Sequence, residues 1–576
     1  MVPILRRALD FKQMGSSLSI FVFAFGILAA NLISLHVHPF RSYYNELAVV
    51  LGLLLALFIQ LRCCSEEVAV PRAILFLIAA LIVLALQSVF GLAHGQQLIF
   101  ACIYLGLACL AFVLGAIWGQ DPHRFRDAVD LIAFAHLIAA LVSVAMQLVQ
   151  VLKIDARPLV MYMAIDGQSS IRPFANLAQP NQLALLLCFG VASLWWVFQS
   201  SKAKNWILAL CLAVLLFGLV LTQSRIAWII LPCLGIMATS GWFGTRKIHG
   251  LFTFLALGLF GVMTWKLPEI SNFMGFTSGS VIERIGGRSE RTILGLQALE
   301  MIRQHPWFGV GWAGFGPQQV NIGADFPQTI YAEHSHNLVL NIGAELGLPI
   351  AIFFFVLFLV WFGRASLVRA ARRRDEVVYV TMFYLAIGVH SMVEFPMWYS
   401  FVLLPMALMA GLMSVDLSTR VFRISNRYLV GLSLLSLVGC VGVTLDYWRV
   451  VDGFGAFRSA KSYEQADPKL IQKPSFTLLP EFYDYFELLQ VKPRAGMGSD
   501  EIQFVEHGSR RFGFVHILDK LAEVYVLNGE PQKATRTMLT LHRLHPFYYA
   551  DYYRYWSELA KEDARFRQVF ESMPAP

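Results

Sequence analysis

The chain has 576 residues, of which 57% are hydrophobic and 15% charged, with a formal net charge of +8 and a mean hydropathy of +0.59. Soluble proteins carry roughly 45–50% apolar and about 25% charged residues, so the composition excludes a soluble globular protein. Because the basic residues are spread over many short segments, the positive charge does not indicate a nucleic-acid-binding surface.

Apolar segments of the length that crosses a bilayer, about 20 residues, recur from the N-terminus to residue 446. The first follows a basic stretch, as in a signal peptide, but no small-residue cleavage site comes after it, so we expect a retained helix. We predict an all-α polytopic membrane protein with about 12–13 transmembrane helices. The expected spans are 17–36, 46–61, 73–92, 98–118, 129–152, 182–199, 205–222, 226–242, 250–266, 337–363, 377–390 (short for a full crossing), 399–415 and 428–446.

The distribution of Lys and Arg predicts the orientation of these spans, because short cytoplasmic loops collect basic residues. With the N-terminus inside, the inward segments hold 19 Lys and Arg residues and the short outward loops hold five. The loop 267–336, the loop 390–399 and the region 447–576 then face outward, which in a bacterium is the periplasm. Since ATP and nucleotide sugars are absent there, bond-forming chemistry would need a substrate already activated on a membrane lipid.

Four parts follow from this topology: transmembrane helices one to nine (1–266), a large periplasmic loop with an amphipathic helix (267–336), the C-terminal transmembrane helices (337–446), and a periplasmic helical region (447–576). The last part resembles a tetratricopeptide repeat, and a single such repeat cannot bury its own apolar face. It could recognise an acceptor protein or cap the site. The residues at repeat spacing are Leu521, Tyr525, Ala534 and Pro546.

Arginines on the outward side oppose the charge rule and therefore need a reason. Arg225 lies in a short turn between two apolar segments, Arg172 follows SSI, and Arg284, Arg288 and Arg291 lie in the large loop. A guanidinium offers paired donors that match phosphate oxygens. These arginines could bind a pyrophosphate head group, or they could contact lipid by snorkelling.

The stretch YAEHSHN (331–337) gathers His334 and His336 directly before an apolar span. A zinc site would need a tetrahedral ligand set, to which only His390 and Glu394 could add, so we predict no metal. A neutral imidazole can take a proton from an attacking hydroxyl. Ordinary structural histidines are the alternative, although the nearby arginines favour a chemical role.

The motif GVGWAG (309–314) fits the glycine pattern of dinucleotide-binding loops. That fingerprint requires a strand before it and a helix after it within a βαβ unit. Here it follows an amphipathic helix in an outward loop. We expect a turn that allows close approach of two backbone segments, and no nucleotide site.

Taken in order, these motifs resemble the O-antigen ligase superfamily. The signature of that superfamily has three parts, which occur in this chain in the same order. They are a Ser-Arg turn after a span, a spaced Arg…Pro…Gly-x-Gly…Phe stretch, and a His-Asn pair that opens a span with Glu-x-Gly. QPNQLA (179–184) and HSMVEFPMWY (390–399) look most like the PglL-type protein O-oligosaccharyltransferases. The matching residues are Ser224, Arg225, Arg291, Ala298, Leu299, Pro306, Gly309, Gly311, Phe315, His336, Asn337, Glu345 and Gly347.

The resemblance implies a GT-C-like glycosyltransferase of the bacterial inner membrane whose site faces the periplasm. It would transfer a preassembled glycan from undecaprenyl pyrophosphate to Ser or Thr of a periplasmic acceptor protein such as pilin, without metal, nucleotide or other cofactor. Carried over by position, His336, Arg225 and Arg291 are catalytic, and Glu345 has a supporting role. The implied substrate-binding residues are Arg172, Gln179, Asn181, Arg288, His334, Asn337, His390 and Glu394.

Other functions remain open. An O-antigen ligase acting on lipid A-core, or an O-antigen polymerase, would share the donor and the histidine stretch. A polysaccharide or lipid transporter would place acidic residues at mid-membrane. Here Asp130 is at a span edge, and His136 and Glu345 are the main interior polar groups, so transport is disfavoured.

Overall fold

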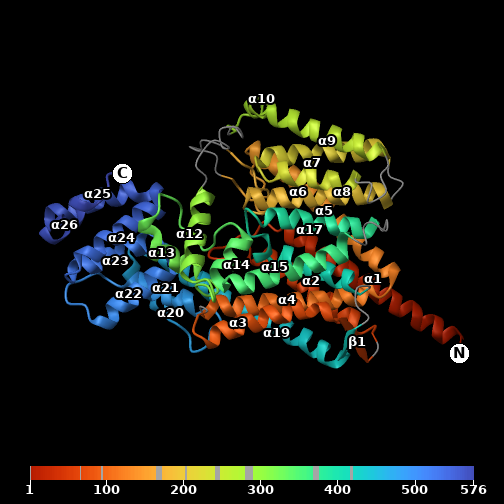
Figure 1. The fold of residues 1–576 in the computed structure, drawn as a ribbon, viewed down its shortest axis with the longest axis horizontal. Coiled ribbons are helices and arrows are strands. Elements are labelled where there is room, and N and C mark those ends of the chain that lie inside the picture. The colour runs from red at the N-terminus through yellow and green to blue at the C-terminus, as the bar shows by residue number, and fades with distance from the viewer. Residues whose placement is uncertain are drawn as a thin grey trace. The chain divides into compact units, whose positions relative to one another are not determined.

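The computed structural model describes residues 2–64, 66–92, 95–163, 171–200, 204–239, 247–278, 290–367, 375–415 and 420–576 (Figure 1). The chain forms two compact units. The first unit contains residues 1–81, 103–287 and 356–441, and the second contains residues 82–102, 288–355 and 442–576.

Helices make up nearly all of the first unit, as the apolar segments predicted. Helices α5 to α9 pack beside one another, in agreement with their neighbouring ribbons in Figure 1. The helices wholly within this unit are α1 (Val2–Leu32), α2 (Tyr43–Leu61), α5 (Pro122–Val151), α6 (Pro180–Ser200), α7 (Asn205–Thr222), α8 (Ala227–Thr239), α9 (Lys247–Trp265), α10 (Leu267–Phe273), α17 (Asp375–His390) and α18 (Ser400–Ser414). Four further helices contain residues of both units, namely α3 (Leu75–Val89), α4 (Gly95–Gly119), α15 (Leu348–Phe362) and α19 (Asn426–Ser459).

The prediction of a multi-pass, all-α membrane protein is confirmed. Nine helices in the described ranges are long and apolar enough to cross a membrane, and Ala227–Thr239, Thr253–Trp265 and Ser400–Ser414 are shorter apolar helices. The segment expected at 377–390 forms α17, whose 16 residues begin with Asp375 and Glu376.

Helices α4 and α18 lie unusually close together at their glycines. A Cβ atom on Gly115 would lie 1.9 Å from the carbonyl oxygen of Leu408, and one on Gly411 would lie 2.0 Å from that of Phe112. In a lipid environment, helices associate through such close backbone approach, because lipid offers no hydrophobic drive between them. A larger side chain at either glycine would force the two helices apart.

Two short strands join distant loops of the first unit. Strand β1 (Glu67–Pro71) pairs antiparallel with β2 (Val421–Ser425), with Glu67 opposite Ser425. The charge distribution assigns both loops to the inward side. The pairing requires them to lie on the same side of the unit, in agreement with that assignment.

The second unit places helices from the large loop beside helices from the C-terminal region, as Figure 1 also shows for α13 and α22 to α24. The loop contributes α12 (Glu290–Gln304), α13 (Phe315–Ile322) and the 3-10 turn η3 (Gly323–Asp325), and α14 (Leu338–Leu346) follows the loop. The C-terminal region contributes α20 (Pro468–Ile471), α21 (Pro480–Gln490), α22 (Ser499–Arg511), α23 (Val515–Leu527), α24 (Pro531–Leu544), α25 (Pro546–Glu562) and α26 (Ala564–Ser572).

The single span expected at 337–363 is wrong. The helix is divided at Gly347, whose φ is 86°, into α14 and α15. The N–H of Leu348 donates to the carbonyl of Pro306 at 2.8 Å, and a Cβ atom on Gly347 would lie 2.3 Å from the carbonyl oxygen of Trp307. The helix breaks because another backbone segment occupies the space that its continuation needs. The membrane span therefore begins at Leu348.

The expected helical hairpin in the C-terminal region is present as α23 and α24. Ala534 is fully buried where these helices meet, and Leu521 and Tyr525 are also buried. Pro546 begins α25, so α24 ends before it at Leu544.

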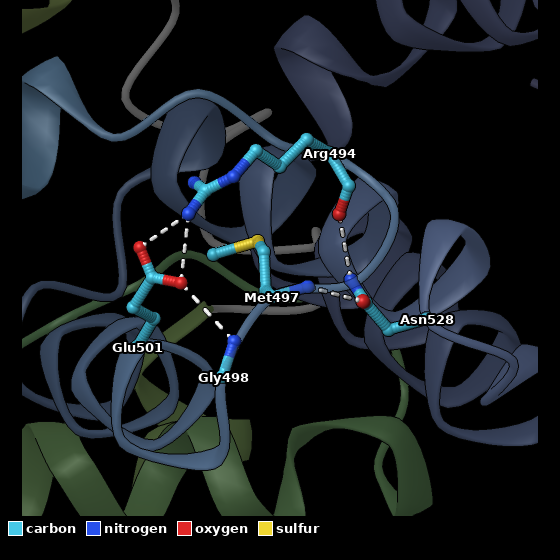
Figure 2. A network of polar contacts seen from close by, with 5 residues as sticks. All are labelled: Arg494, Met497, Gly498, Glu501 and Asn528. Carbon is cyan, nitrogen blue, oxygen red and sulfur yellow. Dashed lines mark hydrogen bonds and ion pairs between the residues drawn. The ribbon is translucent and has the colours of Figure 1, made fainter.

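A polar network joins the loop before α22 to the end of α23, the first helix of this hairpin (Figure 2). Arg494 donates to both carboxylate oxygens of Glu501, at 2.6 and 2.8 Å. Glu501 also accepts from the N–H of Gly498, at the start of α22. Asn528 accepts from the N–H of Met497 and donates to the carbonyl of Arg494, both at 2.9 Å. These bonds attach the loop before α22 to the end of α23.

Candidate functional site

In the first unit, four side chains from separate segments form a hydrogen-bonded group that we call the Asn181 cluster: Arg172, Asn181, Ser224 and Glu394. The Asn181 Oδ1 atom accepts from Arg172 Nη2 at 3.0 Å and from Ser224 Oγ at 2.9 Å. Its Nδ2 atom donates to Glu394 Oε1 at 2.8 Å. Asn181 therefore joins the start of α6, the turn after α7 and the loop after α17.

The turn that carries Arg225 is rigidly built. Gln223 adopts a left-handed conformation with φ of 51°, and its side chain donates to the carbonyl of Ile171 at 2.7 Å. Arg172 donates through Nε to the carbonyl of Thr222 at 2.9 Å. Gln223 and Ser224 are buried, whereas the Arg225 side chain is exposed. The turn thus holds Arg225 outward, while Arg172 is engaged in supporting the turn.

Two of the residues implied by resemblance lie at the end of α17, where His390 is its last residue, and in the loop that follows, which carries Glu394. His390 is fully buried, and Glu394 is 5% exposed. The N–H of Glu394 donates to the carbonyl of His390 at 2.9 Å, which closes the turn between them. Next to Asn181, the buried Oε1 atom of Gln179 has no hydrogen-bond partner among the described residues. The polar groups of this loop and of the start of α6 are brought together through Asn181.

Glu46 is a polar anchor that the sequence reasoning missed. Its carboxylate accepts hydrogen bonds from Ser42 Oγ at 2.7 Å, from the Ser400 N–H at 3.1 Å, and from the hydroxyl of Tyr104. It therefore fixes the start of α18, directly after the loop that carries Glu394. A signal was present, since Glu46 is the acidic residue of the otherwise apolar helix α2.

In the second unit, we call residues 331–337 the histidine loop. His336 has a φ of 55°, a conformation that non-glycine residues adopt rarely and that the surrounding structure must enforce. Buried Ser335 supplies part of that enforcement: its N–H donates to Asn341 Oδ1 and its hydroxyl to the carbonyl of Asn337, both at 3.0 Å. The rings of His334 and His336 lie edge to face, 4.7 Å apart. Both side chains are half-buried.

Asn337 caps helix α14. Its Oδ1 atom accepts from the N–H of Leu340 at 3.1 Å, which satisfies one of the unpaired donors at the helix start. The expected substrate-binding residue is therefore also a structural one, and it turns the chain from the strained backbone of His336 into the helix.

Arg291 lies at the same end of a helix pair as the histidine loop. A Cβ atom on Gly295 of α12 would be 3.7 Å from Leu340 of α14, and one on Gly343 would be 3.0 Å from Ile302. Because contacts advance in the same order along both helices, α12 and α14 run in the same direction. Their first turns, with Arg291 on one and Asn337 at the start of the other, are side by side. The structure thus brings Arg291 to the end of the second unit that carries His336.

The glycine-rich motif is the close-approach turn that the sequence predicted. Gly309 and Gly311 have positive φ values of 68° and 91°. A Cβ atom on Gly309 would lie 2.3 Å from the carbonyl carbon of Glu345, and one on Gly311 would lie 1.7 Å from the oxygen of Leu92. The N–H groups of Val310 and Gly311 donate to the carbonyls of Ala344 and Glu345. The turn seals the C-terminal end of α14.

Gln87 near the end of α3 is a second residue that the sequence reasoning missed. Its side chain donates to the carbonyls of Phe308 and Glu345, at 3.1 and 3.0 Å, and accepts from the N–H of Trp312 at 2.9 Å. An amide side chain within an apolar segment was the signal available in the sequence.

The carboxylate of Glu345 is buried against the glycine-rich turn. It accepts from the N–H groups of Ala313 and Phe315 and from the side chain of Asn341, while burial raises its pKa to about 8. These contacts tie the glycine-rich turn to the residue that also bonds Ser335. Glu345 therefore has the contacts of a supporting residue for the histidine loop.

The predicted site residues thus form two groups, one in each unit. The first unit holds Arg172, Gln179, Asn181, Arg225, His390 and Glu394, and the second holds Arg291, His334, His336 and Asn337. Arg288, like Arg284, lies outside the described residues. Within the described ranges, no group of three or more His, Cys, Asp or Glu residues is arranged to hold a metal ion.

The interior polar groups considered for transport have structural neighbours. The ring of His136 packs between those of Phe189 and Phe383, at 5.2 and 5.5 Å. Asp130 accepts from the Trp196 indole at 2.7 Å. Both side chains are thereby accounted for by packing and hydrogen bonding, and neither contact suggests a transport path.

Comparison with known proteins identifies two regions that match known families. The family described as O-Antigen ligase matches residues 210–355, a range that contains Arg225, Arg291 and His336. The family described as virulence factor membrane-bound polymerase, C-terminal, matches residues 378–561.

Two relatives come from Acinetobacter baylyi. The chain is 23% identical over 570 residues to its general O-oligosaccharyltransferase, covering 94% of this chain and 95% of the relative. It is 24% identical over 395 residues to its ComP-specific O-oligosaccharyltransferase, covering 67% and 70%. These matches confirm the resemblance to the O-antigen ligase superfamily and, within it, to the PglL-type oligosaccharyltransferases.

Proposed function

We propose that this multi-pass membrane protein of the glycosyltransferase type is a protein O-oligosaccharyltransferase of a bacterial inner membrane. It transfers a preassembled oligosaccharide en bloc from undecaprenyl pyrophosphate to Ser or Thr hydroxyls of periplasmic acceptor proteins such as pilin. The similarity to a general O-oligosaccharyltransferase over nearly the whole chain supports this proposal. The outward orientation predicted from the distribution of Lys and Arg supports the periplasmic side for the reaction.

The observation that carries the chemistry is the geometry of the histidine loop. His336 is held in a left-handed conformation between buried Ser335 and the helix cap Asn337, and its ring is half-exposed. Enforced backbone strain of this kind is typical of residues with a chemical task. We assign to His336 the role of general base.

In the proposed reaction, the acceptor hydroxyl oxygen attacks the anomeric carbon of the donor glycan. Its proton passes to an imidazole nitrogen of His336 as the new glycosidic bond forms. The bond from the anomeric carbon to the pyrophosphate oxygen breaks, and its electron pair leaves with undecaprenyl pyrophosphate. The charge that develops on this leaving group is best stabilised by fixed cationic donors, which we assign to Arg225 and Arg291.

The Asn181 cluster suits a positioning role in this scheme. Asn181 links Glu394 to Ser224, the residue directly before exposed Arg225. Arg172 supports the same turn through the carbonyl of Thr222. We therefore propose substrate-binding roles for Arg172, Gln179, Asn181, His390 and Glu394 in the first unit and for His334 and Asn337 in the second. We propose the same role for Arg288, which lies outside the described residues.

Mass spectrometry of periplasmic proteins and of lipopolysaccharide, from matched strains with and without the gene, tests the proposal. Loss of protein-linked glycans alone, restored by the wild-type gene and not by a His336→Asn variant, is the expected result. Loss of O-antigen from lipid A-core would replace the proposal with a ligase. Shortened O-antigen chains would indicate a polymerase, and donor retained on the inner face of the membrane would indicate a transporter.

A further inference from the structure

We propose that the C-terminal helical region positions the histidine loop, with Arg511 as the positioning residue through which it acts. The kinetic part of this inference depends on the proposed function, because it predicts a rate of glycan transfer. The contacts that support it all lie within the second unit.

The first support is a backbone attachment between the two segments. The N–H of Thr329 donates to the carbonyl of Arg543 at 2.8 Å, and the N–H of Tyr331 donates to that of Leu544 at 2.9 Å. The chain entering the histidine loop therefore donates two hydrogen bonds to carbonyls of the last turn of α24. Such main-chain bonds set position without depending on side-chain rotamers.

The second support is the slot that receives the side chain of Tyr331. Its ring lies 6.0 Å from those of Phe514 and His545, both of which belong to the C-terminal region. A Cβ atom on Gly513 would lie 2.5 Å from the Tyr331 ring, so only glycine leaves room for it there. His545 contacts the carbonyl of Gly513 at 2.7 Å, which closes the slot.

The third support is the placement of Arg511 at the end of α22. Its guanidinium bonds to Glu481 through Nη2 at 2.7 Å and Nε at 2.9 Å. Glu481 is held in turn by the N–H of Gln96 at 3.0 Å. Fixed in this way, Arg511 presents Nη1 at 3.8 Å from the carboxylate of Glu333, in the histidine loop.

Burial distinguishes this contact from an ordinary surface ion pair. Most ion pairs between exposed side chains contribute little to the free energy of folding. The Arg511 side chain, in contrast, is only 15% exposed. Glu333 is 58% exposed and can move, so an oriented, immobile cation beside it restricts the loop more than it stabilises the fold. The left-handed backbone of His336, three residues later, needs such restriction to persist.

The chain offers a matched control. Arg536 of α24 pairs with Asp325 of η3 at 2.7 Å, with side chains 55% and 58% exposed. This pair also joins the C-terminal region to the large loop, but it lies away from the histidine loop in sequence. Removing the Arg536–Asp325 pair tests whether the rate of glycan transfer depends on any ion pair between these segments or only on the pair at Glu333.

The test compares Arg511→Gln, Glu333→Gln and their double variant with Arg536→Gln, in full-length protein purified in detergent. Turnover is followed with a lipid-linked glycan donor and an acceptor protein. We expect kcat to fall about tenfold in both single variants, within the range of typical coupling between sites, with the KM for donor changed less than about twofold. The double variant is expected to be no slower than Arg511→Gln, Arg511→Lys to recover part of the rate, and Arg536→Gln to match the wild type.

Hydrogen exchange provides a readout that does not require the reaction. Peptides covering residues 329–337 are expected to exchange faster in Arg511→Gln than in the wild type or Arg536→Gln. Unchanged exchange, or a lower yield of folded protein with the kcat of the remainder unaltered, would overturn the positioning role. A wild-type protein that transfers no glycan to any acceptor would contradict the proposed function, while the exchange experiment would still decide this inference.

Discussion

The side-chain amide of Gln87 donates a hydrogen bond to the carbonyl of Glu345 at 3.0 Å, joining residues that are 258 positions apart. The same amide group serves Phe308 and Trp312. One buried side chain in α3 thus satisfies three backbone groups around the turn that seals α14. Helix α14 begins at Leu338, two residues after His336, so Gln87 holds the far end of the helix that follows the histidine loop.

Replacing Gln87 by Leu is expected to destabilise the second unit. The change removes the side-chain partner of the Phe308 carbonyl and of the Trp312 N–H, whereas the Glu345 carbonyl keeps its bond from the N–H of Gly311. Leaving a polar group without its partner away from water costs about 1–3 kcal/mol. Thermal unfolding in detergent is expected at a lower temperature, with reduced glycan transfer. Gln304→Leu, at an exposed position of α12, is the control and is expected to leave both unchanged. An unaltered melting temperature for Gln87→Leu would contradict the structural role.

His336→Asn is expected to remove most of the catalytic rate while leaving the fold intact. Asn tolerates the left-handed conformation that His336 adopts but cannot act as a base near neutral pH. Loss of a general base typically lowers a rate by about 10²–10⁴-fold. Turnover and thermal unfolding would be measured together, with exposed His305→Asn as control. Wild-type turnover in His336→Asn would exclude the proton-transfer role.

Arg291→Lys is expected to lower turnover by about tenfold or more, since an ammonium group cannot reproduce the paired donors of a guanidinium. Arg291 lies in the first turn of α12, where a positive charge opposes the helix dipole. Arg291 therefore does not stabilise the helix at this position. Arg303→Lys, in the last turn of the same helix, is the matched control. Equal rates for the two variants would reduce Arg291 to a lipid contact.

Asn181→Asp is expected to disrupt the Asn181 cluster. The Nδ2 donor, 2.8 Å from Glu394 Oε1, would become a carboxylate oxygen facing another carboxylate, which is unfavourable in a partly buried setting. Binding of the lipid-linked donor and thermal stability are both expected to decrease. Asn205→Asp, at the exposed start of α7, provides the control. Donor binding as tight as in the wild type would separate this cluster from the donor site.

Asp519 in α23 predicts a pH dependence for the stability of the C-terminal region. Burial, with the nearby charge of Glu523, raises the pKa of Asp519 from 3.8 to about 7. The folded state therefore binds this proton more tightly than the unfolded state does. The stabilising contribution is complete below pH 4 and is lost as the pH rises from about 4 to about 7.

The variant Asp519→Asn is expected to remove this pH dependence. Its amide oxygen can still accept the Trp556 indole bond, which is 2.7 Å long in the wild type. The melting temperature of the variant is expected to exceed that of the wild type at pH 8 and to approach it at pH 5. Asp551→Asn, at an exposed position, is the control. A pH profile that Asp519→Asn leaves unaltered would contradict the assignment.

Sequence patterns predicted the helical membrane architecture because apolar length and loop charge are local properties that a bilayer constrains strongly. Segment 205–222, for example, coincides with α7. The span 337–363 was wrong because its break at Gly347 depends on a backbone segment that arrives from Pro306. A hydropathy profile cannot predict tertiary contacts of this kind.

The candidate site also has residues that the sequence predicted and residues that only tertiary contacts reveal. Arg225, Arg291 and His336, to which we assign the chemistry, stood out in the sequence because polar groups are rare in an apolar chain. Gln87, Glu46 and Arg511 were missed because most of their partners are distant in sequence. The link between Arg172 and the Arg225 turn likewise needed three dimensions, since it joins a side chain to the Thr222 carbonyl.

The β1–β2 ladder has a consequence for biosynthesis. Glu67 and Arg423, whose side chains form an ion pair between the two strands, are 356 positions apart, so β1 must remain unpaired until the ribosome has made most of the chain. Closure of so long a loop is slow, and it becomes possible only after the intervening helices have been inserted with both strands on one side. A helix inserted in the wrong orientation would leave the strands on opposite sides of the bilayer. The ladder would therefore form last, and only in molecules whose insertion was completed correctly.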